Sequence, residues 1–250
     1  MKWNQRLLIS AMMMLAMLFI AIPNVLAESN IIKLPFDPNN FVRKINNPYF
    51  PLKPGTTFIY RGETDGTPTK DVMTVTHQTK EILGVTTTVI HDRVYEDGVL
   101  TEDTLDWYAQ DKQGNVWYFG EDTKELDENG NVISTEGSWE AGVDGAKPGI
   151  VMLAHPHKGD KYQQEFAPDV AEDMAQVLGF KDSLCVPYGC FQHVLVTKEW
   201  TPLEPGVVEN KYYAKGVGFI YSEMVKGGDE TLALVRIRHQ NGDNDNENDD

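Results

Sequence analysis

The sequence is poor in cysteine and in basic residues. It contains 2 cysteines in 250 residues, too few for a small domain held together by disulfides. Lys and Arg total 22 against 38 Asp and Glu, which gives a formal net charge of −16. Binding of nucleic acid needs clustered basic side chains that neutralise phosphates, so this balance argues against a nucleic-acid partner.

Short motifs of common enzyme classes are also lacking. There is no G-x-S-x-G, no H-E-x-x-H, no glycine-rich phosphate loop and no C-x-x-C. We therefore expect no cofactor, assign no catalytic residue, and favour a protein without enzymatic activity.

The first 27 residues have the pattern of a secretory signal peptide. Lys2 and Arg6 precede an apolar run over 7–23, and the segment ends at the small residue Ala27. An uncleaved membrane anchor is the alternative, because the run approaches the length that spans a bilayer. No cysteine follows Ala27 to accept a lipid. We expect export to the periplasm or the extracellular space, with no membrane span after cleavage.

The other end of the chain is strongly polar. Residues 240–250 read QNGDNDNENDD and contain no apolar side chain, which predicts a disordered acidic tail. The Asp and Asn alternation resembles the start of a calcium-binding loop, but the Gly and the distal Glu of that loop are missing.

Residues 28–239 are predicted to form a single β-rich domain. Hydrophobic residues make up 41% of the chain and aromatics 10%, enough for a packed core and too much for a disordered or collagen-like chain. Runs of β-branched and aromatic residues alternate with turn dipeptides, which predicts an all-β, mainly antiparallel fold. A meander of about ten strands must curl into a barrel, a half-barrel or a sandwich. The expected strands cover residues 56–60, 71–79, 85–95, 99–109, 191–201, 207–214, 219–225 and 231–238.

Two predicted hairpins share the turn sequence D-x-x-G-N, at 111–115 and 127–131. Asp opens a type I turn and Gly takes the left-handed position that follows it. In the first hairpin this register pairs Ala109 with Trp117, Trp107 with Phe119, and Tyr108 with Tyr118 on the opposite face.

One short helix is predicted at Pro168–Leu178. Val170, Met174 and the pair Val177-Leu178 recur at helical spacing on one face. We expect this helix to pack on the sheet or across the mouth of a barrel.

Four motifs carry a resemblance to a known group of proteins. They are NPYFPLKPGT at 47–56, DWYAQD at 106–111, GNVWYFGE at 114–121 and YYAKGVGF at 212–219. Together they resemble a widespread family of exported bacterial proteins and lipoproteins of unknown function, over most of residues 36–236. The resemblance implies an exported antiparallel β domain and supplies no catalytic residues.

The favoured functional hypothesis is ligand binding in a cupped sheet. Small barrels and half-barrels can enclose a ligand. We expect a concave pocket lined by Trp107, Trp117 and Phe119 that holds a small or apolar ligand, or a surface that binds an envelope protein.

A metal site is the second hypothesis. His155 and His157 point to the same side of an extended chain, and with Asp160 they provide three ligands of the kind that bind zinc. A metal-dependent hydrolase would follow, whereas the Gly, Pro and Lys residues nearby are typical of an exposed loop.

Cys185 and Cys190 are separated by four residues, among them Pro187 and Gly189. Export favours a structural disulfide here over free thiols, and its short loop predicts about 2 kcal/mol of stabilisation.

Acids and aromatics also gather between 103 and 140. Paired carboxylates with aromatic platforms are the components of a glycosidase, but a half-buried sheet has the same composition. A structural component of the cell envelope, kept soluble by an acidic tail, is the third hypothesis. The clustered residues are Asp103, Asp106, Trp107, Tyr108, Trp117, Tyr118, Glu121, Asp122, Glu136, Trp139 and Glu140.

Overall fold

The computed structural model describes residues 31–240. The predicted signal peptide (1–27) and residues 241–250 of the predicted acidic tail lie outside the described residues. The described chain is all-β and mostly antiparallel, which confirms the predicted fold class. Its only helical element is one 3-10 turn, η1 (Pro38–Asn40), begun by the Asp37 side chain accepting from the Asn39 amide at 2.9 Å.

Two series of long strands make up most of the molecule. The bounds of all described strands are β1 (Ile31–Ile32), β2 (Phe41–Val42), β3 (Ile45–Asn47), β4 (Phe50–Leu52), β5 (Thr56–Thr64), β6 (Thr67–Ile82), β7 (Val85–Glu96), β8 (Val99–Asp111), β9 (Val116–Leu126), β10 (Val132–Ser134), β11 (Trp139–Glu140), β12 (Lys147–Met152), β13 (Lys161–Gln163), β14 (Glu165–Phe166), β15 (Met174–Val186), β16 (Gly189–Trp200), β17 (Val208–Ala214), β18 (Gly218–Lys226) and β19 (Glu230–His239).

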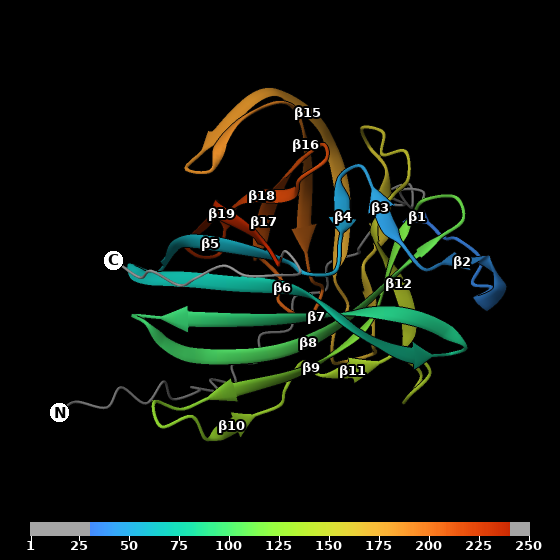
Figure 1. Cartoon of the computed structure of the whole chain (residues 1–250), viewed down its shortest axis with the longest axis horizontal. Coiled ribbons are helices and arrows are strands. Elements are labelled where there is room, and N and C mark those ends of the chain that lie inside the picture. Colours follow the sequence, from blue (N-terminus) through green and yellow to red (C-terminus); the bar gives the residue numbers. More distant parts are fainter. Residues whose placement is uncertain (1–30, 241–250) are drawn as a thin grey trace, which may run out of the picture.

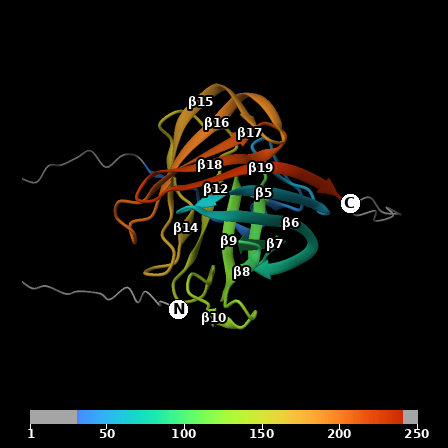
Figure 2. The same cartoon turned by 90° about the vertical axis from the view of Figure 1, so that its left-hand side faces the viewer.

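Each series is an antiparallel meander, β5 to β9 and β15 to β19. The two join where β19 pairs with β5 from Glu230↔Thr64 to His239↔Thr56. The resulting sheet is strongly curved and is not a closed barrel. In Figure 1 strands β6 to β9 lie in the lower half and β15 and β16 arch over the top, and Figure 2 shows the same arch from the side. The sheet therefore has a concave inner face and an outer face.

Turn chemistry sets the register of the β8–β9 hairpin. The Asp111 amide donates to the Asn115 carbonyl at 2.9 Å, and Gly114 has a φ of 98°. Ala109 pairs with Trp117 and Tyr108 with Tyr118, as predicted. The Asp111 carboxylate accepts from the Asn115 amide at 2.9 Å and from Trp117 Nε1 at 3.0 Å, which fixes the turn to the strand that follows it.

The predicted pairing of Trp107 with Phe119 falls in a β-bulge. The register shifts after Tyr108↔Tyr118, so that the next pair is Asp106↔Glu121. The extra residue lies on β9 beside Gly120, whose φ is 123°. A Cβ at Gly120 would collide with the Trp139 carbonyl of β11, so glycine is required for this close approach.

The predicted helix at Pro168–Leu178 is wrong. The segment makes a turn closed by the Ala167↔Ala171 bridge and then enters β15 at Met174. Strand β15 pairs with β13 on one side and with β16 on the other, and these long-range hydrogen bonds override the local helical spacing. The expected apolar helix face is not buried as a unit, because Val170 is 46% and Leu178 39% exposed.

Side-chain alternation gives β5, β6 and β7 two faces of different character. Tyr60 lies opposite Asp71, and both point to the inner face, while Arg61 opposite Lys70 points to the outer face. Within residues 31–240, no helix has the length and hydropathy needed to cross a bilayer.

Candidate functional site

The aromatic residues predicted to line a pocket are packed inside the protein. Trp107, Trp117 and Phe119 are 5%, 4% and 0% exposed. Phe41 of β2 packs on two of them, with ring centroids 5.7 Å from Trp117 and 5.6 Å from Phe119. The third, Trp107, is contacted by Lys80, whose Nζ lies 3.3 Å from the ring centroid.

A cavity of about 340 Å³ lies on the opposite side of β8 from these aromatic residues, where Tyr108 faces inward. We call it the inner cavity. It is lined mainly by residues of β4 to β8 and of β16 to β19, with Val151 of β12 and Gln164, so that both halves of the curved sheet contribute. The lining residues are Phe50, Pro51, Leu52, Phe58, Tyr60, Asp71, Met73, Asp92, Tyr108, Val151, Gln164, Glu199, Glu209, Lys211, Tyr213, Val217, Gly218, Phe219, Ser222, Glu230 and Leu232.

Most of the wall of the inner cavity is apolar or aromatic. Tyr60 and Phe219 lie with ring centroids 5.0 Å apart, and the Tyr60 hydroxyl donates to the Phe219 carbonyl at 3.2 Å. Tyr108 stacks on Tyr118 at 4.6 Å. These contacts hold the rings in place, so the apolar wall is formed before any ligand enters.

One polar group in the cavity is neutralised from within. Lys211 Nζ lies 3.1 Å from Glu199 Oε2 and 3.4 Å from Glu209 Oε2. Glu199 Oε1 also accepts from Thr197 at 2.7 Å and from the Tyr213 hydroxyl at 3.2 Å. This part of the wall is therefore satisfied without a ligand.

A second polar group, Asp71 and Asp92, is satisfied only in part, by a hydrogen bond between the two carboxyls. The Oδ1 atom of each carboxyl is buried and has no hydrogen-bond partner within residues 31–240. Burial, and then the negative charge of Asp92, raises the pKa of Asp71 well above its usual range. The pKa of Tyr60 is raised well above its usual range by burial and by the same two carboxylates. A buried polar atom without a partner costs free energy, which a complementary ligand would recover.

The charge of the wall is strongly unbalanced. Among the described residues that line the inner cavity, five are carboxylic acids and one, Lys211, is a cation that already contacts two of them. The unmatched negative charge beside Asp71 and Asp92 favours a positively charged group.

Two further carboxyls with raised pKa values, Asp106 and Glu121, lie outside the cavity lining. Asp106 accepts from the Tyr118 hydroxyl at 2.6 Å, and its pKa is raised well above its usual range by burial and then by Asp92. Burial, and then the charge of Glu102, raises the pKa of Glu121 to about 7.

The three residues of the predicted metal site do not form a ligand set. His157 Nδ1 lies 3.6 Å from Asp160 Oδ2, and the His157 amide donates to the same oxygen at 2.8 Å. His155 and His157 are both exposed. Within residues 31–240, no three His, Cys, Asp or Glu side chains are placed to hold one metal ion. The carboxylate closes a loop of the backbone here, which explains why the spacing resembles a metal motif.

Cys185 and Cys190 form a disulfide across the end of the β15–β16 hairpin, with Cα atoms 4.0 Å apart. The two residues are directly paired in the strand register. Neither cysteine lines the inner cavity.

Sequence reasoning missed Asp71 and Asp92 as site residues. Asp71 belongs to the same strand face as Met73 and Val75, which are apolar and point inward. The sequence signal that could have identified Asp71 is its position as a charged residue on the apolar face of a predicted strand. It gains meaning only when β7 and β6 are aligned and Asp92 is found on the same face.

Comparison with known proteins gives no family. No protein-family model matches the sequence, and no curated protein matches it. Two crystal structures are similar in fold. One is a predicted exported protein with a YmcC-like fold from Bacteroides fragilis, with 15% identity and a TM-score of 0.46 over 76% of this chain and 98% of that chain. The other is a predicted lipoprotein from Parabacteroides distasonis, with 12% identity and a TM-score of 0.44 over the same shares.

At these identities the likeness assigns no activity to this chain. The motif resemblance to a family of exported proteins stays a prediction, as do export itself and the ligand-binding role of Trp107, Trp117 and Phe119.

Proposed function

We propose that this protein is an exported, non-enzymatic binding protein whose inner cavity takes a small ligand with a positively charged amine and an apolar body. The observation that carries the proposal is the pair Asp71 and Asp92, each with a buried Oδ1 atom that has no hydrogen-bond partner within residues 31–240, in a wall that is mostly apolar or aromatic.

The size and the wall of the cavity support a small molecule. Its volume, about 340 Å³, is at the lower end of the range of small-molecule sites. Such sites are mostly apolar, with a few polar groups that fix the orientation of the ligand. Phe58, Met73 and Leu232 provide the apolar part, and the two aspartates provide the polar part.

Two features support an amine over a metal ion or a neutral ligand. Within residues 31–240, no three His, Cys, Asp or Glu side chains come together, so a metal ion would lack the protein ligands that coordinate it. An ammonium group donates up to three hydrogen bonds, which suits carboxylate oxygens that lack a donor. The aromatic rings of Tyr60 and Phe219 beside them also favour a cation.

Binding is favoured over catalysis by where the carboxyls lie. A glycosidase needs two carboxyls on either side of the substrate bond, one of them protonated. Burial raises the pKa of Asp106 and of Glu121, but neither residue lines the cavity. Asp71 and Asp92 do line it, but they lie side by side on the neighbouring strands β6 and β7 and hydrogen-bond each other. The metal-dependent hydrolase loses its support because its ligand set does not assemble.

The test is binding of three probes with one chain length, octylamine, octan-1-ol and octanoate, measured by isothermal titration calorimetry on the full chain. Octylamine should bind more tightly than the alcohol, and octanoate should bind least. Asp71→Asn and Asp92→Asn should each weaken octylamine binding about tenfold, because a charge-assisted hydrogen bond is lost.

The exposed turn variant Asp65→Asn changes the net charge equally and should leave affinity unchanged. Because Asp71→Asn removes a buried like-charge contact, its thermal midpoint should stay the same or rise, so weaker binding is not a folding defect. Equal binding of the amine and the alcohol, or of the aspartate variants and the parent, would contradict the proposal.

A structural envelope component is the remaining candidate from the sequence. It requires stable protein partners and no small-molecule ligand. Native mass spectrometry of the purified protein distinguishes the two, because the proposed function expects a co-purified amine and the structural role expects none.

A further inference from the structure

The outer face of the same strands carries a second hollow, with the opposite charge. It has a volume of about 980 Å³, and we call it the outer groove. It lies on the outer side of β5, β6, β7 and the end of β19. Its lining residues are Thr57, Ile59, Arg61, Lys70, Val72, Thr74, His91, Arg93, Tyr95, Val235, Arg236, Arg238, His239 and Gln240.

The groove concentrates the arginines of the protein. The whole chain has six arginines and sixteen lysines, and four of the six arginines line this one hollow. They are Arg61, Arg93, Arg236 and Arg238. With Lys70 they place five cations and no carboxylate in the lining of a chain whose formal charge is −16. Solubility does not explain why arginines are clustered here, because lysine provides most of the positive charge in the rest of the chain.

Strand pairing sets these side chains side by side. Arg61 lies directly opposite Lys70, and Lys70 lies opposite Tyr95 of β7. Arg236 and Arg238 follow a bulge in β19 and pair with Ile59 and Thr57 of β5. Neighbours on one face of a sheet are about 5 Å apart across strands and about 7 Å apart along a strand. The cations therefore form an array with the spacing of a linear charged chain.

The five cations of the groove form no ion pairs with acids within residues 31–240. Lys70 Nζ instead lies 4.5 Å from the centroid of the Tyr95 ring. Arg93 Nε is buried and has no hydrogen-bond partner among the same residues.

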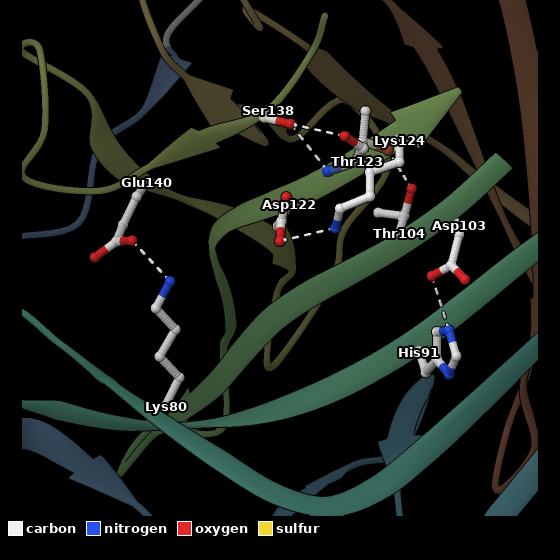
Figure 3. A network of polar contacts seen from close by, with 9 residues as sticks. All are labelled: Lys80, His91, Asp103, Thr104, Asp122, Thr123, Lys124, Ser138 and Glu140. Carbon is white, nitrogen blue, oxygen red and sulfur yellow. Dashed lines mark hydrogen bonds and ion pairs between the residues drawn. The ribbon is translucent and has the colours of Figure 1, made fainter. Parts of the chain in front are cut away.

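Two carboxylates border the groove. Asp103 lies opposite Arg93 in the β7–β8 register, and its Oδ1 contacts His91 Nε2 at 2.9 Å, as Figure 3 shows. Glu63 is two residues beyond Arg61 on the same face of β5. They limit the array at its edges and leave its centre positive.

We propose that the outer groove binds a soluble chain that carries several sulfate or phosphate groups. A guanidinium presents parallel N–H donors that match two oxygens of a tetrahedral oxyanion, which lysine cannot do, and this accounts for the selective placement of arginine. The groove is a hollow on the sheet, and its apolar lining residues Ile59, Val72 and Val235 are not exposed enough to enter a bilayer. A linear chain can lie along it, whereas a flat membrane cannot reach its floor.

The net charge of the molecule does not oppose this proposal. Charges on exposed groups are screened beyond about 8 Å at physiological salt, so the local array decides what binds. The proposal is independent of the inner cavity, because the two hollows share no lining residue.

The test uses a sulfated heparin hexasaccharide and sodium tripolyphosphate, with a hyaluronan hexasaccharide as the carboxylate-only control. Calorimetry at 50 and 150 mM NaCl on the full chain should show binding of at least one of the two oxyanion probes, weaker at the higher salt concentration, and less than a tenth of that affinity for hyaluronan. The double variant Arg236→Gln/Arg238→Gln should weaken binding about tenfold or more. The double lysine variant, Arg236→Lys/Arg238→Lys, should also weaken binding of the oxyanion probe. Lysine keeps the positive charge but lacks the two parallel N–H donors of the guanidinium.

The chain offers a matched control in Arg43, the one described arginine outside the groove, which is exposed. Arg43→Gln should change affinity less than twofold, and all variants should keep the parent's thermal midpoint because the substituted side chains are on the surface. Which of the two probes binds more tightly identifies sulfate or phosphate as the natural group.

Four results would overturn the proposal: no binding of either oxyanion probe, hyaluronan binding as tightly as heparin, an equal loss in Arg43→Gln, or binding only to phosphatidylglycerol vesicles. A fifth concerns the chain's own acidic segment. A separate variant replaces Asp243, Asp245, Glu247, Asp249 and Asp250 by Asn or Gln. If the probes bind only to this variant, the ligand of the groove is the acidic C-terminal segment of the chain itself.

Discussion

Asp71 and Asp92 differ from most exposed acids of the protein in their environment, and this changes what their carboxyl groups can do. Many acids within residues 31–240 lie in turns or on exposed faces, where water solvates them. These two lie on the inner face of β6 and β7, beside Tyr60 and Met73, where burial raises the pKa of Asp71. A cation bound beside Asp71 offsets the burial that raises the pKa of this carboxyl in the empty protein.

This predicts a pH dependence for the binding of octylamine. A cation binds the ionised form of Asp71, whose pKa is raised in the free protein. Affinity should therefore increase as the pH rises from 5 to 8, while octylamine itself stays protonated. In Asp71→Asn the increase should be much smaller. A flat profile for the parent protein, measured by calorimetry, would show that Asp71 does not contact the ligand.

At the scale of elements, the strands and tight turns follow closely from the sequence. The D-x-x-G-N turns and the alternation of β8 and β9 come from neighbours within ten residues, and they were predicted to the residue for Ala109↔Trp117. The bulge at Gly120 and the strand at Met174–Val186 were missed because both depend on distant partners. A helical spacing of apolar residues gives no information about a strand that is paired on both sides.

Gly120 offers a test of the bulge. Gly120→Ala places a methyl group against the Trp139 carbonyl and requires alanine to adopt a φ of 123°, so β11 must move away from β9. We expect a loss of about 2–3 kcal/mol in the free energy of unfolding in urea. The control is Gly130→Ala, which also has a positive φ, 80°, but open space around it, and should cost about 1 kcal/mol. Equal losses would mean that the close approach to β11 does not matter.

At the scale of the whole molecule, one curved sheet separates charges of opposite sign. Acids line and surround the inner cavity, and arginines line the outer groove of the same strands. The ion pair between Lys80 Nζ of β6 and Glu140 of β11, at 2.7 Å, connects two strands that do not pair with each other (Figure 3). The net charge of the chain argues against a nucleic-acid partner. Because it is a sum over the whole molecule, it does not show that acids and arginines gather on opposite faces of the sheet.

The buried acids predict that stability decreases as the pH rises. The pKa values of Asp71, Glu102, Asp106, Glu121 and Glu165 are raised in the folded protein, mainly by burial. Between about pH 4.5 and 7 the folded state then binds more protons than the unfolded chain, so the free energy of unfolding falls as these protons are released.

Glu121, with a pKa of about 7, should account for on the order of 2 kcal/mol of this loss, allowing for partial solvent screening. Thermal unfolding of the parent should show a lower midpoint at pH 8 than at pH 5, and Glu121→Gln should reduce the difference. Glu128→Gln, an exposed position in the turn after β9, is the control and should leave the difference unchanged. A midpoint that rises toward pH 8 would contradict the assignment of these pKa shifts.

The sequence by itself determined the all-β class, most of the long strands and the two tight turns, because alternation and turn chemistry are local properties of the backbone. It also placed Cys185 and Cys190 close enough for the disulfide that the β15–β16 register provides. Only the tertiary structure decided which face of each strand is concave. The aromatic face of β8 and β9 is covered by Phe41, whereas the face with Asp71 and Asp92 encloses the cavity. The physical reason is that β19 must pair with β5 before either cavity or groove exists, and this pairing joins residues about 170 positions apart in the chain.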